Sequence, residues 1–242
     1  MNATVAQLTV RSLLGRRRAL LLMALPGVLL LIAALTRGLA GAKDEHTVGI
    51  LGGLALATLV PLLGLIAGTG AIGPEIDDGS IVYLLSKPVS RFSIAVTKAL
   101  VAVTVVTVFA AFPTLLAGCI LSGTSGRLAV AYGLGALTAG IAYVTLFLLL
   151  AVITRHAVIV GVLYALIWES LVGSFVPGAQ GLSIQQWSLA LTEKVLGTRA
   201  DPLGVSAAVG FGTSVVLLVV VIVGSTWYAG CRLRTLRLTS DE

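Results

Sequence analysis

The sequence predicts an all-α membrane protein with six transmembrane helices, and three observations support this fold class. Of the 242 residues, 57% are hydrophobic and 11% are charged, whereas soluble domains have about 25% charged residues. The mean hydropathy is +1.06. The apolar stretches run for roughly 18 to 28 residues, which suits helices that cross the hydrocarbon and exceeds the roughly 10 residues of a barrel strand.

Six apolar segments are long enough to cross about 30 Å of hydrocarbon as helices. They cover residues 19–36, 47–72, 94–121, 128–153, 157–176 and 205–229. Together they predict a single transmembrane domain over residues 1–242. The first segment follows three arginines, as in a signal peptide, but no convincing small-residue cleavage site follows it, so we expect a retained helix.

The distribution of Lys and Arg predicts the orientation of the chain in the membrane. An even number of spans puts both termini on one side, and 11 of the 16 Lys and Arg residues lie on that side. Loops rich in Lys and Arg stay in the cytoplasm, so both termini are predicted to be cytoplasmic. The net charge of +6 then reflects topology, and no nucleic-acid partner is expected because the sequence has no RNA-recognition pattern.

Residues 1–18 precede the first span and combine apolar side chains with a basic end. Val5, Leu8, Ser12 and Leu13 are compatible with an amphipathic helix that lies on the inner membrane surface. The alternative is a frayed, positively charged tail.

The second predicted span carries small residues at four-residue spacing. They are Gly49, Gly53 and Ala57, and then Gly64 and Gly68. This spacing stacks small residues on one helix face, where they let another helix approach closely. The face serves either packing within one bundle or contact with a second copy of the chain.

The segment between the second and third spans predicts a short amphipathic helix at the cytoplasmic surface. Pro74 suits the first helical position, because its missing N–H would have no helical partner there. The first turn is acidic, which the helix dipole favours, and its acidic residues are Glu75, Asp77 and Asp78. Pro88 ends the helix, and Lys98 is expected to reach the interface from inside the third span. Such a helix either rests on the membrane or presents a surface to a cytoplasmic partner.

The same segment resembles the corresponding segment of type-2 ABC exporter permeases. It carries, in order, Glu75, Gly79, the pair Leu84 and Leu85, the run Pro88-Val89-Ser90-Arg91, and Lys98. In that family the segment reads as an acidic residue, a glycine, a leucine pair, Pro-x-Ser-Arg and a lysine, and the six-span topology extends the likeness over the whole chain. The resemblance implies a coupling helix that docks on an ATPase through Glu75, Asp77, Asp78, Gly79, Tyr83, Leu84, Pro88, Ser90 and Arg91. It also implies that residues 1–18 correspond to the connecting helix of the family.

The resemblance implies a permease subunit of an ABC exporter in the bacterial cytoplasmic membrane. Its partners would be two copies of a separate ATPase subunit, a second permease half that is identical or homologous, and membrane lipid. ATP and Mg²⁺ would bind the ATPase and this chain would bind no cofactor, in keeping with the lack of a Gly-Lys dipeptide and hence of a P-loop. The apolar spans suggest an amphipathic substrate, such as a drug, an antibiotic or a lipid.

Three other functions are weighed against the exporter permease. The chain is alternatively a secondary transporter driven by an ion gradient, or a membrane anchor or signalling subunit without transport. Secondary transporters usually show internal repeats and several buried charges, and neither is evident. A membrane enzyme is disfavoured because no catalytic motif is present. The chain has two cysteines, Cys119 and Cys231, which are too few for a zinc site and fall at opposite membrane faces, so neither a metal site nor an intrachain disulfide is expected.

Glu169 is predicted to lie deep inside the fifth span. It follows Arg155 by about 14 residues, which puts it roughly 21 Å from the cytoplasmic edge. A carboxylate at this depth is a candidate for the transport pathway, and the resemblance supports this because the fifth span of the family usually lines the pathway. The alternative is a carboxyl group that is bonded within the helix bundle.

Residues 177–204 are predicted to be external and to include a helix before the last span. One face of this helix is apolar and consists of Ile184, Trp187, Leu191 and Val195. Gly197 closes the helix, and Asp201 with Pro202 is expected to form the cap and first turn of the sixth span. The resemblance implies an external gate that includes Trp187 and Leu191, while the alternative is a helix that rests on the outer surface.

Overall fold

A computed structural model describes residues 3–77, 91–122, 126–172 and 179–235 of the chain. These residues form helices and connecting turns, with no strand among them. Five helices are long and apolar enough to cross a membrane, namely Arg18–Ala40, Asp44–Ile76, Phe92–Ser122, Gly126–Ile153 and Phe211–Leu233. A shorter apolar helix, Ala157–Glu169, lies where the fifth span is predicted. The all-α class is confirmed for these residues, while the described part of the fifth span falls short of the length of the others.

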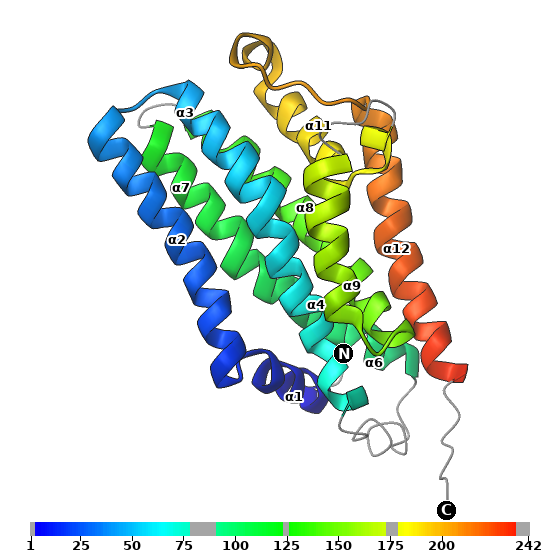
Figure 1. Ribbon diagram of the computed structural model, residues 1–242. Coiled ribbons are helices and arrows are strands. Elements are labelled where there is room, and N and C mark those ends of the chain that lie inside the picture. The colour runs from blue at the N-terminus through cyan, green and yellow to red at the C-terminus, as the bar shows by residue number, and fades with distance from the viewer. Residues whose placement is uncertain (1–2, 78–90, 123–125, 173–178, 236–242) are drawn as a thin grey trace, which may run out of the picture.

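The long helices run back and forth along one axis (Figure 1). The first is α2 (Arg16–Ala40), and the second pass consists of α3 (Asp44–Gly49), η1 (Ile50–Leu59) and α4 (Val60–Asp77). The third consists of α6 (Arg91–Val106), η2 (Thr107–Ala111) and α7 (Phe112–Ser122), and the fourth is α8 (Gly126–Ile153). The fifth consists of α9 (Ala157–Leu163) and η3 (Tyr164–Val172), and the last is α12 (Phe211–Thr235). At one end of the bundle lies α1 (Ala3–Leu13), where α12 also ends, and at the other end lies α11 (Ile184–Leu196).

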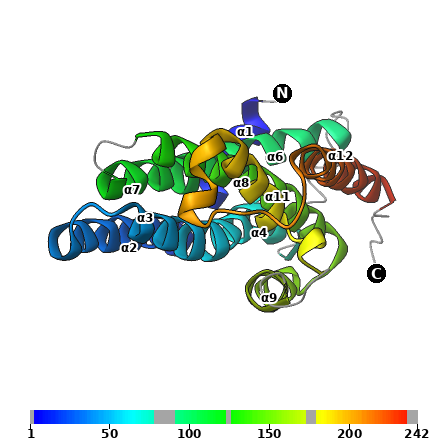
Figure 2. The same ribbon diagram turned by 90° about the horizontal axis from the view of Figure 1, so that it is seen from above.

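The central helix of the bundle is α8, which packs against α4, α7, α11 and α12 (Figure 2). Glycines let α4 approach it closely. A Cβ added to Gly64 would lie 2.6 Å from Cβ of Tyr143, and one added to Gly68 would lie 2.7 Å from the carbonyl oxygen of Val144. A Cβ at Gly53 would meet no heavy atom within 4 Å. The part of the small-residue face at Gly64 and Gly68 therefore serves packing within the chain.

Two stretches of wide, π-helical turns lie directly before prolines. The first, η1, ends two residues before Pro61, and η2 ends two residues before Pro113. Proline has no N–H to donate, and its ring clashes with the carbonyl group of the preceding turn. Wider turns relieve this crowding, so both spans stay helical through their prolines.

The end of α4 differs from the expectation for Pro74. The helix continues through Pro74 to Asp77, so Pro74 lies inside α4 and Glu75 belongs to its last turn. The missing N–H of Pro74 deprives the Gly70 carbonyl of its helical partner. This oxygen accepts hydrogen bonds from Ser12 Oγ at 3.2 Å and Arg18 Nη1 at 3.3 Å. Side chains from outside the helix thus replace the lost bond, and no separate helix begins at Pro74.

The last span begins at Phe211, later than the predicted residue 205. The expected cap and first turn instead form η6 (Asp201–Leu203), a short 3-10 turn that ends at Gly204 with a φ of +68°. Between Gly204 and Phe211, the amide of Ala207 donates to Oε2 of Glu193 in α11 at 2.8 Å. The segment before α12 is not helical because backbone groups such as this one find partners in α11.

The helix predicted before the last span is present as α11. The Ser183 hydroxyl caps its first turn by accepting a hydrogen bond from the amide of Gln186 at 3.3 Å. Gly197 follows the last residue of α11 with a φ of +60°, in the left-handed region that glycine favours. The sequence predicted the end of α11 at Gly197, and the Ser183 cap explains why the helix begins at Ile184.

The N-terminal segment forms a helix, α1, which rules out the frayed tail. Val5, Thr9 and Leu13 are buried at four-residue spacing, and α1 packs against α4 and α6. Leu8, which the sequence placed on the apolar face, is 47% exposed. The buried face of α1 therefore faces the bundle, and Leu8 lies on another face of the helix.

Candidate functional site

Most of the predicted ATPase-docking residues fall within residues 78–90. The structure describes the residues on either side of this segment but not the segment itself. Asp78, Gly79, Tyr83, Leu84, Pro88 and Ser90 lie outside the described residues. Asp77 ends α4 and Arg91 begins α6, and of the side chains in this set the structure describes that of Glu75. The predicted coupling helix is thus bracketed by the last turn of α4 and the first turn of α6.

A buried ion pair joins these two flanks. Lys98 in α6 is fully buried, and its Nζ donates to Oε1 of Glu75 at 2.6 Å and to the carbonyl oxygen of Ala71 at 2.7 Å. Lys98 therefore does not extend to the interface, contrary to the expectation. The carboxylate of Glu75 and the carbonyl groups at the end of α4 stabilise its charge inside the bundle.

The ion pair, which we call the α4–α6 strut, fixes the spacing of the two helices. Removing one partner of a buried pair leaves an uncompensated charge and typically costs about 3–5 kcal/mol. Glu75 is 19% exposed, so the strut lies at the margin of the buried region. The strut therefore joins the last turn of α4 to α6, the two described helices on either side of residues 78–90.

The turn from α1 into α2 (residues 12–18), which we call the elbow, contacts the same end of α4. Leu13 is fully buried, and a Cβ added to Gly70 would lie 2.8 Å from its Cδ2 atom. Because Gly70 has no side chain, Leu13 can pack directly against α4 at this position. The Gly70 carbonyl group accepts the hydrogen bonds from Ser12 and Arg18 described above. Together with the strut, these contacts join α1, α4 and α6 at one end of the bundle.

Glu169 in η3 is a fully buried hydrogen-bond acceptor. It accepts hydrogen bonds from Tyr164 Oη at 3.2 Å, from the amide of Ile184 at 3.1 Å, and from Ser183 Oγ. Two of these donors belong to the start of α11. The carboxylate thus bonds within the bundle, as the alternative interpretation expects, and it fastens α11 to the end of the fifth pass.

The two candidate gate residues lie on α11, at the end of the bundle opposite α1 (Figure 1). Trp187 is 4% exposed and donates its Nε1–H to the carbonyl oxygen of Gly181 at 2.8 Å. Leu191 is partly buried against the same hydrophobic core. Trp187 therefore fixes α11 to the preceding turn, η4 (Ala179–Leu182).

The sequence alone does not reveal the partners of these buried charges. Tyr164 precedes Glu169 by five residues, the spacing of a π-helical hydrogen bond, but nothing in the sequence marks η3 as π-helical. Ser183 is recognisable as a helix cap, but its second role toward Glu169 depends on how α11 packs. The bond from Arg18 to Gly70 also went unpredicted, although Pro74 signals an orphaned carbonyl group four residues before it.

Comparison with models of known protein families gives a match over most of the chain. The sequence model for ABC-2 family transporter protein matches residues 5–229. None of the curated proteins compared with the chain matches it. The matched region runs from α1 into α12 and so includes the strut, the elbow and Glu169. The chain therefore belongs to the ABC-2 family of transporter proteins and is a membrane protein with several apolar helices.

Proposed function

We propose that the chain is the permease subunit of an ATP-driven exporter, with residues 1–242 forming one transmembrane permease domain. The family match over residues 5–229 carries this proposal. Two permease halves, identical or homologous, enclose a pathway in the bacterial cytoplasmic membrane, and both termini lie in the cytoplasm. Two copies of a separate ABC ATPase bind ATP and Mg²⁺, and this chain binds neither.

The ATPase docks on residues 74–91, which include the predicted coupling residues from Glu75 to Arg91. The α4–α6 strut supports this assignment because it anchors both ends of the segment through Glu75 and Lys98. The Gly70 contacts extend the anchored unit to α1. A displacement of the docked segment is therefore passed to the second and third spans together.

ATP binding closes the ATPase dimer and moves the coupling segments, and the spans then tilt from an inward-open to an outward-open arrangement. Nucleotide acts by shifting the populations of two packings of the same helices. The substrate is amphipathic, in keeping with the apolar spans. Glu169 lies beside the pathway as a fixed acceptor, and Trp187 and Leu191 belong to the external gate.

Whether an ATPase chain copurifies with this protein in detergent is the first test. We expect Arg91→Gln to lower ATPase docking or substrate-stimulated hydrolysis in proteoliposomes by roughly fivefold or more, the usual scale of a coupling energy. The matched control is Arg199→Gln, which removes an exposed arginine of η5 (Gly197–Arg199), directly after α11 at the other end of the bundle. Transport in vesicles that contain no ATPase would refute the proposal.

Variants of the strut residues, Glu75 and Lys98, are tested in the same assays. Glu75→Gln leaves the buried Lys98 without its counter-charge, so we expect loss of both stability and coupling. Glu75→Gln combined with Lys98→Met removes both charges and should recover the thermal unfolding midpoint. If the pair transmits motion, coupling stays low in the double variant, whereas full recovery of hydrolysis would limit the pair to a role in folding.

A further inference from the structure

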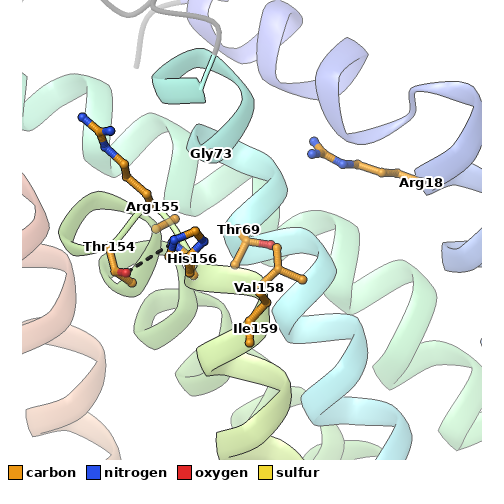
Figure 3. Close-up of a pocket in the computed structure, with 10 residues that line it drawn as sticks. Arg18, Thr69, Gly73, Thr154, Arg155, His156, Val158 and Ile159 are labelled. Atoms are coloured by element: carbon orange, nitrogen blue, oxygen red, sulfur yellow. Dashed lines mark hydrogen bonds between the residues drawn. The ribbon is translucent and has the colours of Figure 1, made fainter.

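A basic pocket opens at the end of the bundle that holds α1 and the strut (Figure 3). Its ten lining residues come from the start of α2, from α4, and from the α8–α9 connection, and its volume is about 210 Å³. That is more than ten times the roughly 15 Å³ that a single water needs. Two arginines, Arg18 and Arg155, and His156 line it, and none of the ten residues is acidic.

The cations of the pocket have no carboxylate partner among the described residues. The ion pair of Lys98 with Glu75 lies outside this pocket, and neither Arg18 nor Arg155 forms an ion pair with any residue that the structure describes. Arg18 is held in place by its bond to the Gly70 carbonyl oxygen at 3.3 Å, and a guanidinium group has five N–H donors, of which this bond uses one. A preplaced arginine without a counter-charge is suited to bind an anion.

Hydroxyl groups and exposed apolar side chains complete the pocket. Thr69 and Thr154 line it beside the cations, and Thr154 Oγ1 accepts a hydrogen bond from the amide of His156 at 3.2 Å. Figure 3 shows Arg18 reaching in from one side, with Thr69 and His156 between it and Arg155. Val158 and Ile159 also line the pocket and are 56% and 61% exposed. The cationic and hydroxyl groups therefore adjoin apolar surface that faces outward from the bundle.

We propose that this pocket binds the phosphate headgroup of an anionic phospholipid, whose acyl chains lie along Val158 and Ile159. A free phosphate ion would satisfy the arginines and threonines but would leave the apolar rim exposed. Basic pockets between transmembrane helices on the cytoplasmic side suit anionic headgroups, which are enriched in that leaflet. The bound lipid bridges α2, α4 and the α8–α9 connection. The proposal shares the cytoplasmic orientation of the proposed function but needs no ATPase.

The test uses the purified full chain without any ATPase, so its failure is distinct from failure of the exporter proposal. The thermal unfolding midpoint and native mass spectrometry are followed as phosphatidylglycerol or phosphatidylcholine is added in detergent. We expect the wild type to prefer phosphatidylglycerol, and Arg155→Gln to weaken that binding about tenfold, the usual effect of losing one charged hydrogen bond. Arg199→Gln, which removes an exposed arginine outside the pocket, should leave the preference unchanged.

A second variant leaves all the bonds of the pocket in place. A Cβ added to Gly73, which lines the pocket, would meet no heavy atom within 4 Å. Gly73→Glu therefore introduces a negative charge without a clash, and it should abolish the preference for phosphatidylglycerol, while the neutral Gly73→Gln retains most of it. Inorganic phosphate alone should not stabilise the protein. Equal stabilisation by phosphate, or an unchanged lipid preference in both Arg155→Gln and Gly73→Glu, would overturn the proposal.

Discussion

Glu169 shows how a buried charge is accommodated at the level of single residues. Its carboxylate accepts bonds from the Tyr164 and Ser183 hydroxyls and from the Ile184 amide. A carboxylate with three donors is strongly stabilised in a buried site. The residue therefore fixes the position of α11, and any contact with a transported molecule must compete with these bonds.

We expect Glu169→Gln to destabilise the protein by about 2 kcal/mol, because an amide cannot accept all three hydrogen bonds. Ser183→Ala should cost about 1 kcal/mol through the lost cap and should combine less than additively with Glu169→Gln, since both remove the same contact. Unfolding in detergent measures these changes. Ser122→Ala is the matched control, since that buried hydroxyl donates to Gly118 of its own helix. Additive effects of Glu169→Gln and Ser183→Ala would contradict the assigned bond.

The residues that carry charge were predictable as candidates, whereas their partners were not. Lys98 and Glu75 both appear in the sequence motif, yet their pairing across 23 residues depends on how α6 packs on α4. From an isolated helix, the Lys98 side chain can extend either to the membrane interface or into the bundle. The Glu75 carboxylate and the Ala71 carbonyl oxygen at the end of α4 accept hydrogen bonds from Lys98 Nζ, so the side chain points into the bundle.

At the scale of helices, length and hydropathy predicted where spans lie but not where each one ends. The structure extends α4 beyond residue 72 to Asp77 and starts α12 at Phe211 instead of residue 205. In both places, side chains from another element satisfy backbone groups: Ser12 and Arg18 bond to Gly70, and Glu193 bonds to Ala207. Hydropathy averaged over a stretch of sequence contains no information about such bonds.

The close packing of α4 on α8 leads to a prediction about glycine. We expect Gly68→Ala to destabilise the protein by about 1–3 kcal/mol, since the added methyl group would lie 2.7 Å from the Val144 carbonyl oxygen. Gly27→Ala in α2 is the control, because a Cβ there meets no heavy atom within 4 Å and alanine favours the helix by about 0.5–1 kcal/mol. The two thermal unfolding midpoints should shift in opposite directions. A loss of stability confined to Gly27→Ala would contradict this packing.

For the whole molecule, the order of the passes puts α1 and the end of α12 at one end of the bundle (Figure 1). The connection between α2 and α3 lies at the opposite end. Together with the excess of Lys and Arg beside the termini, this arrangement predicts that the strut, the elbow and the basic pocket face the cytoplasm.

Single cysteines test this orientation. In a background with Cys119→Ser and Cys231→Ser, we expect Ala42→Cys to react with a membrane-impermeant maleimide added to intact spheroplasts, because this exposed residue lies in the connection between α2 and α3, at the predicted external end. Gln7→Cys, on the exposed side of α1, should react only after the membrane is permeabilised. The opposite pattern of labelling would invert the topology and place the basic pocket at the outer face.

The sequence alone determined the all-α class, the approximate positions of the spans, the end of α11 at Gly197 and the family resemblance that the match confirms. These follow from local quantities, because a bilayer requires a fixed length of apolar helix and a cap acts within one turn. Only the tertiary structure decided the partners of Lys98, Glu169 and Gly70, the ends of α4 and α12, and the gathering of cations in one pocket. Those depend on contacts between residues as far apart as Ser12 and Gly70, 58 positions along the chain, which form only when the helices pack.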